Sequence, residues 1–135
     1  MLKIALIALL TSQSWTTDCI MSQSTSHQGY SRETATFTTA DTLKYSFKTE
    51  WFSDSGCNES QNAVEEIEGS ILIGEVIAGG MNGKTFEADF VRENKTELGA
   101  IEINTNQKSI RLSKTSFGNS RNTMLSLFPY FGTRK

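Results

Sequence analysis

The sequence predicts an all-β domain that forms a single antiparallel up-and-down barrel, with a β-sandwich as the alternative. Three observations lead to this prediction. Residues 41–54 alternate apolar and polar side chains with a period of two. Eight or nine short segments of strand character follow one another at spacings of about 8–14 residues, with no convincing amphipathic helix among them. Pro129 is the one proline, and the abundance of Thr, Ser and Asn favours strands joined by polar turns.

The first three strands are expected at residues 15–20, 31–38 and 41–54. The second is rich in threonine, contains Phe37, and reaches the third through a turn at 39–41. The third has an apolar face of Leu43, Tyr45, Phe47 and Trp51 and a polar face of Lys44, Ser46, Lys48 and Glu50. A helix would scatter these residues around its circumference, so the alternation indicates a strand with one buried face.

The remaining strands follow at similar intervals. Residues 64–73 place three isoleucines on one side, and Gly69 among them indicates a close approach or a bulge. Residues 84–92 follow an Asn82-Gly83 hairpin turn and carry Phe86, Ala88 and Phe90 on one face. Further strands are expected at 75–78 as an extension of 64–73, at 100–104, at 109–113 and within 125–135, with a polar loop at 114–122.

Residues 1–14 are typical of a secretory signal peptide. Lys3 supplies the positive charge, residues 4–10 form the apolar run, and Ser12 and Ser14 fit the small residues before a cleavage site. Such a run is too short to cross a bilayer, which takes about 20 residues. We therefore predict a secreted or periplasmic protein whose mature domain is residues 15–135. The alternative is a buried N-terminal strand or helix that is never removed.

Cys19 and Cys57 are the two cysteines of the chain. In an exported protein an even count indicates a disulfide, with two unpaired buried thiols as the alternative. Closing a loop of about 38 residues would stabilise the fold by about 4 kcal/mol in the chain-entropy model. Lipidation of Cys19 is disfavoured, because Thr-Thr-Asp precedes it where a lipoprotein has small and aliphatic residues. Two cysteines and one histidine are also too few for a closed zinc site.

The sequence offers no positive support for an enzyme or a metal centre. His27 lies in a polar stretch, and no serine stands in a G-x-S-x-G motif. The acidic residues Glu65, Glu66 and Glu68 fit a solvated strand face better than a metal site. A net charge of −2 leaves no electrostatic footprint for nucleic acid. We expect no catalytic residue, no cofactor, no metal ligand, no nucleic-acid partner and no membrane span, and a monomer.

Two short motifs carry a resemblance to a known family. Trp15-x-x-x-Cys19 opens the first strand, and Phe52-x-Asp54-x-x-Cys57 ends the long one. This arrangement resembles a group of small exported bacterial proteins of uncharacterised function. It is also similar to the extracellular lipocalin-like domain of the APC-down-regulated family of membrane-bound Wnt-signalling inhibitors. The resemblance, which covers residues 15–57 in pattern, implies a lipocalin-like barrel with the two cysteines bridged and an apolar ligand inside.

Five aromatic side chains are expected inside the barrel: Tyr45, Phe47, Trp51, Phe86 and Phe90. Inward positions of a small closed barrel either pack as a solid core or line a ligand cavity. We predict a non-enzymatic binding protein that holds a small apolar ligand, a lipid or a fatty-acid-like molecule, against these residues. The alternative is a solid-core interaction module of the cell envelope or secretome, whose loops (first the His27 loop and residues 114–122) contact another protein.

The leader-like segment and the even number of cysteines together predict a cleaved protein with one disulfide. Protein exported by its own host should have the intact mass of residues 15–135, and alkylation should add mass only after reduction. A mature protein that still begins at Met1 would contradict the predicted cleavage. Two thiols that alkylate before reduction would contradict the disulfide.

Overall fold

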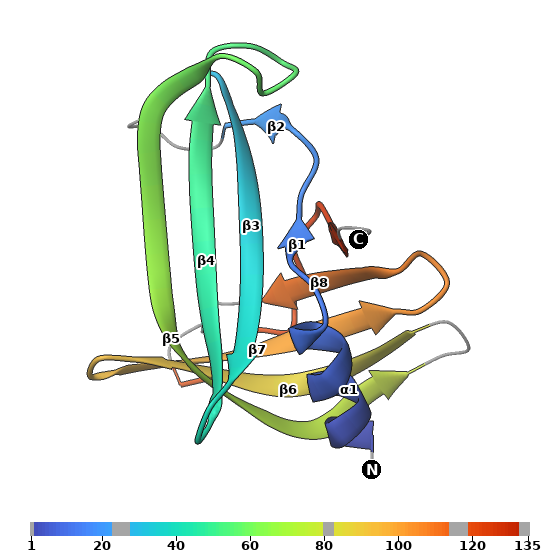
Figure 1. The fold of residues 1–135 in the computed structure, drawn as a ribbon. Coiled ribbons are helices and arrows are strands. Elements are labelled where there is room, and N and C mark those ends of the chain that lie inside the picture. Colours follow the sequence, from blue (N-terminus) through green and yellow to red (C-terminus); the bar gives the residue numbers. More distant parts are fainter. Residues whose placement is uncertain (1, 23–27, 80–82, 114–118, 133–135) are drawn as a thin grey trace.

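The computed structural model describes residues 2–22, 28–79, 83–113 and 119–132, and these form an antiparallel barrel with one short helix (Figure 1). The elements in chain order are α1 (Leu2–Thr11), β1 (Trp15–Thr16), β2 (Ile20–Met21), β3 (Tyr30–Thr39), β4 (Leu43–Phe52), β5 (Ser60–Gly79), β6 (Gly83–Arg92), β7 (Lys95–Asn104), β8 (Ser109–Ser113) and β9 (Tyr130–Gly132). The predicted all-β barrel is therefore confirmed.

One sheet contains all nine strands, in the order β1-β9-β8-β7-β6-β5-β4-β3-β2. It closes because β1 pairs with two strands. Trp15 lies opposite Gly132 of β9 and also opposite Ala35 of β3. Eight strands therefore form the barrel, and β2 is an additional short strand that pairs with the beginning of β3.

The strand β5 is longer than the sequence predicted. The strand expected at 64–73 and its extension at 75–78 lie in one strand of 20 residues, which pairs with β4 up to Ser70 and with β6 from Ser70 onward. The strand therefore turns the corner between the two halves of the barrel. A Cβ at Gly69 would collide with the Val91 carbonyl oxygen and the Tyr45 hydroxyl. The close approach predicted at this glycine is confirmed.

The predicted faces of the long strand are also confirmed. Leu43, Tyr45, Phe47 and Trp51 are buried on β4, while Lys44 and Lys48 are exposed. Similarly, Phe86, Ala88 and Phe90 of β6 are buried. The predicted first strand at 15–20 is interrupted, since β1 ends at Thr16 and β2 begins at Ile20.

The apolar run of residues 4–10 lies in the helix α1, which packs against the barrel. Leu6 is 3 % exposed and Leu10 is fully buried, and both belong to the same hydrophobic core as the inward side chains of the strands. The buried Trp15 indole donates a hydrogen bond from Nε1 to the Leu10 carbonyl oxygen over 3.1 Å. In the intact chain the N-terminal segment is therefore part of the core, whereas its predicted cleavage stays a prediction.

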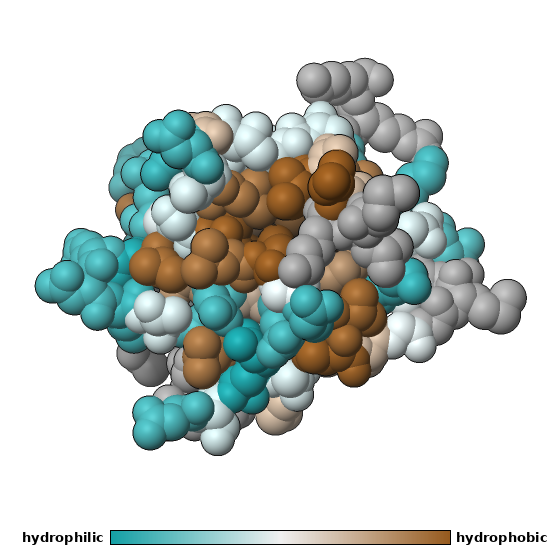
Figure 2. All heavy atoms as spheres, turned by 90° about the horizontal axis from the view of Figure 1, so that it is seen from below, coloured by the Kyte–Doolittle hydropathy of each residue, from teal (hydrophilic) through white to brown (hydrophobic). Residues whose placement is uncertain are grey.

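Figure 2 views the molecule from below Figure 1, the side on which α1 lies, and hydrophobic residues gather on this face. Ile4 of α1 is 70 % exposed, and Val76 and Ile77 of β5 are also exposed. The helix therefore buries one apolar face in the barrel and presents another to solvent.

The predicted disulfide is confirmed. Cys19, between β1 and β2, is bonded to Cys57 in the connection between β4 and β5. Asp54 shapes this connection, because its Oδ1 accepts hydrogen bonds from the backbone N–H groups of Asn58 (2.9 Å) and Glu59 (2.7 Å). These bonds to the charged form lower the pKa of Asp54. The aspartate of the Phe52-x-Asp54-x-x-Cys57 motif thus holds the loop in which Cys57 adopts a φ of 54°.

The packing of α1 makes a prediction about stability. We expect residues 15–135 alone to unfold at lower urea concentration than residues 1–135, with a free energy of unfolding lower by about 4 kcal/mol or more. Leu6 and Leu10 leave the core, and each buried leucine removed by truncation costs about 3–5 kcal/mol. The Trp15 indole also loses its acceptor. Equal free energies of unfolding for the two chains would show that α1 adds nothing to the core.

The inward face of β4 makes a second prediction. Phe47→Asp should lower the free energy of unfolding by about 4 kcal/mol or more, since it removes a buried ring and places an unpaired carboxylate in the core. Thr38→Asp is the matched control, because Thr38 is exposed on the neighbouring strand β3. Urea unfolding followed by Trp fluorescence measures both. A Phe47→Asp protein as stable as the control would mean that this face of β4 is not the buried one.

Candidate ligand pocket

The sheet bends at Ser70, where β5 leaves β4 and begins to pair with β6. Ser70 lies opposite Lys44 near the start of β4 and opposite Val91 near the end of β6, so the β6–β7 turn lies near the start of β4 and away from the β4–β5 connection. Figure 1 shows the β4–β5 connection at the top, with α1 and the β6–β7 turn low in the molecule on opposite sides. Leu6 and Leu10 of α1 belong to the packed core on the side of the helix.

A pocket of about 330 Å³ lies where the first half of β4 faces the β6–β7 turn. Its lining comes from four consecutive strands and consists of Tyr45, Phe47, Ile67, Phe90, Arg92, Lys95 and Glu97. The register explains this set, since Phe47 lies opposite Ile67 and Phe90 lies opposite Glu97. The volume is at the lower end of the range of about 300–1,000 Å³ for small-molecule sites.

Aromatic rings form the apolar floor of this pocket. Tyr45 and Phe47 stack with ring centroids 4.7 Å apart, and Phe90 meets the Tyr45 ring edge to face at 5.5 Å. Phe37 meets Phe47 edge to face at 6.3 Å. Because the rings interlock, they hold each other in fixed positions and offer a preformed surface to an apolar molecule.

Charged side chains stand at the mouth of the pocket. Arg92 and Lys95 lie opposite each other across the two-residue turn between β6 and β7, and Lys95 is exposed. The distance from Arg92 Nη2 to Glu97 Oε1 is 3.9 Å, which is an ion pair longer than a hydrogen bond. Burial raises the pKa of the Tyr45 hydroxyl, an effect that the charge of Arg92 opposes. The hydroxyl is therefore a neutral donor at neutral pH.

The five aromatic residues named from sequence separate into two groups. Tyr45, Phe47 and Phe90 line the pocket. Phe86 is buried in the hydrophobic core and Trp51 is buried at the end of β4, but neither is part of the lining. Sequence reasoning missed the charged mouth. Arg92 could have been found from the alternation of residues 86, 88 and 90, which puts position 92 on the same inward side.

A larger hollow of about 520 Å³ lies outside the barrel at the corner formed by β5. Most of its lining is polar and comes from outward positions, among them Thr38, Lys44, Glu68 and Ser70. Tyr45 is the one aromatic residue in this lining, whereas three aromatic rings line the smaller pocket. We therefore place the candidate site in the smaller interior pocket.

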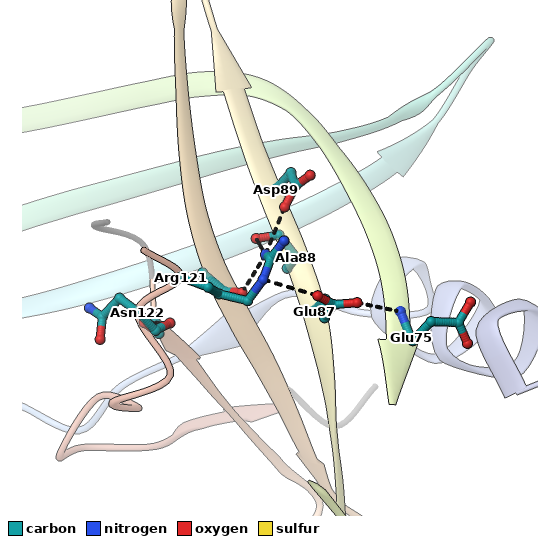
Figure 3. A network of polar contacts seen from close by, with 8 residues as sticks. Glu75, Glu87, Ala88, Asp89, Arg121 and Asn122 are labelled. Atoms are coloured by element: carbon teal, nitrogen blue, oxygen red, sulfur yellow. Dashed lines mark hydrogen bonds and ion pairs between the residues drawn. The ribbon is translucent and has the colours of Figure 1, made fainter. Parts of the chain in front are cut away.

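A polar network outside the barrel holds the segment before β9 in place (Figure 3). Arg121 Nε lies 3.1 Å from Glu87 Oε2, and its Nη1 lies 2.7 Å from Asp89 Oδ1 and 3.0 Å from the Gly99 carbonyl oxygen. Glu87 also accepts a hydrogen bond from the backbone N–H of Glu75. The network joins the segment to β5, β6 and β7. Among the described residues, Arg121 thus anchors this segment to the barrel wall.

Other sequence candidates do not gather into a site. His27 and residues 114–118 lie outside the described residues. Glu65, Glu66 and Glu68 are exposed, and a side-chain hydrogen bond with Glu66 and its negative charge raise the pKa of Glu68. Within the described ranges, no three His, Cys, Asp or Glu side chains are grouped to hold a metal ion.

The helical part of the described chain contains no segment long and apolar enough to cross a membrane. Comparisons with protein-family models, curated proteins and solved structures found no match to this chain. The resemblance carried by the Trp and Cys motifs therefore stays a prediction.

Proposed function

We propose that this chain is an exported, non-enzymatic binding protein that holds a small apolar ligand inside its barrel. The observation that carries the proposal is the interior pocket of about 330 Å³, whose floor is made by Tyr45, Phe47, Ile67 and Phe90. Concave sites that combine hydrophobic and aromatic side chains with a few placed polar groups are the usual form of a small-molecule site. The ligand class is a lipid or a fatty-acid-like molecule.

Two further observations support parts of this proposal. The disulfide between Cys19 and Cys57 fits an oxidising compartment, and with the leader-like residues 1–14 it supports export. Leu6 and Leu10 of α1 pack in the core of the intact chain, whereas Arg92 and Lys95 line the pocket beside the β6–β7 turn. A ligand would therefore enter past charged side chains and rest on aromatic ones.

A second candidate is an interaction module that contacts another protein through its loops. The segment before β9 favours it, because Met124 is 74 % exposed and Leu127 is 82 % exposed. Phe128 and Phe131 nearby are also partly exposed. Arg121 fixes the start of this segment to the barrel wall and Ser126 N donates to the Leu112 carbonyl oxygen, so these apolar side chains are presented on a held backbone. Exposed apolar groups of this kind are typical of protein contact sites.

The binding proposal predicts that filling the pocket abolishes binding. Ile67→Trp places a large ring in the space that the partly buried Ile67 lines, and should weaken binding of the uncharged fluorescent probe N-phenyl-1-naphthylamine by about tenfold or more. Val64→Trp is the matched control, since Val64 is exposed on the same strand and outside the lining. Fluorescence titration measures both affinities.

The outcomes separate the two candidates. Binding that both variants retain would place the probe somewhere other than this pocket. If the wild-type chain takes up no probe, and native mass spectrometry of protein from its own host finds no copurifying lipid, the ligand proposal is wrong. The interaction module, with its exposed Met124 and Leu127, is then the function to pursue.

A further inference from the structure

The mouth of the pocket carries more positive than negative charge. Arg92 and Lys95 bring two positive charges to it, and Glu97 brings one negative charge. All three lie beside one tight turn, because Arg92 pairs with Lys95 and Glu97 follows two residues later on β7. Glu93, in the turn itself, is exposed and lies outside this lining. A charged group that enters the pocket therefore meets two positive charges and one negative charge on the pocket wall, beside a low-dielectric aromatic floor.

The donors at the mouth are suited to an anion. The Arg92 side chain is 36 % exposed and its Nη2 lies 3.9 Å from Glu97 Oε1, beyond hydrogen-bond distance, so a carboxylate can reach the guanidinium. Tyr45 lines the same pocket and carries a hydroxyl that stays protonated. Arginine, lysine and tyrosine together offer donors from three side chains. A neutral alcohol would use them less well, because hydrogen bonds to charged groups are roughly twice as strong.

The apolar floor and the volume of the pocket indicate what the remaining part of the ligand is. Phe47, Ile67 and Phe90 offer apolar surface below the charged mouth. The volume of about 330 Å³ is small for this class of site. One short acyl chain fits such a space better than the two chains of a phospholipid.

We infer that the pocket selects a single-chain amphiphile with an anionic head, whose carboxylate binds Arg92 and Lys95 while its chain lies on Phe47, Ile67 and Phe90. This inference rests on the proposed function and adds the class and the orientation of the ligand. Lys95 attracts the head from the exposed rim, and Arg92 holds it at the entrance to the apolar floor.

Three probes of equal chain length test it: decanoate, decanol and decylamine, each titrated at pH 8 below its aggregation concentration. Isothermal titration calorimetry of the full chain should give a Kd for decanoate about tenfold or more below that for decanol, and decylamine should bind most weakly. Arg92→Gln should remove most of the decanoate preference, because it weakens decanoate binding much more than decanol binding. Lys84→Gln is the matched control, because Lys84 is exposed on the same strand and outside the lining.

Each result has a distinct meaning. Equal affinities for decanoate and decanol, or tighter binding of decylamine, would overturn the anionic-head inference while the proposed binding function stands. Binding of none of the three probes would remove the proposed function itself. Circular dichroism and urea unfolding check that Arg92→Gln is folded, and Arg92→Lys, which keeps the positive charge, should recover part of the decanoate preference.

Discussion

The sheet closes at Trp15, whose backbone lies opposite Ala35 of β3 on one side and Gly132 of β9 on the other. A closed barrel has no free strand edge and encloses an interior. The burial of the inward side chains on all the remaining barrel strands therefore depends on this closure. Side chains secure the same seam. Tyr130 of β9 hydrogen-bonds to Glu33 of β3, and burial, followed by the charge of Glu33, raises the pKa of the Tyr130 hydroxyl.

Two constraints divide the enclosed interior. At one end Leu6 and Leu10 of α1 fill the space, and the Trp15 indole is hydrogen-bonded to the end of that helix. In the middle the aromatic rings of β3, β4 and β6 interlock. Beside the β6–β7 turn, a pocket of about 330 Å³ combines aromatic walls with charged side chains. The barrel thus contains both a packed core and a small pocket.

The N-terminal segment bears both on the packing of the core and on the predicted export of the chain. Its composition is typical of a leader, yet its leucines pack in the core of the intact chain. These properties are physically compatible, because the same apolar run that is typical of a leader also favours burial in any apolar cavity. If residues 1–14 are removed, the barrel loses core side chains at one end, and the mature domain then relies more on closure at Trp15 and on the bond between Cys19 and Cys57.

The sequence by itself determined the fold class, the inward faces of β4 and β6, the close approach at Gly69 and the disulfide. Period-two alternation, glycine placement and cysteine count are local or countable properties, so they could be recognised before any strand was paired. Only the tertiary structure decided that Tyr45, Phe47 and Phe90 line this pocket while Phe86 and Trp51 are not part of its lining, and that Arg92, Lys95 and Glu97 line it as well. Those facts depend on the register between β5, β6 and β7 and on how neighbouring rings interlock, and neither is encoded in any single stretch of the chain.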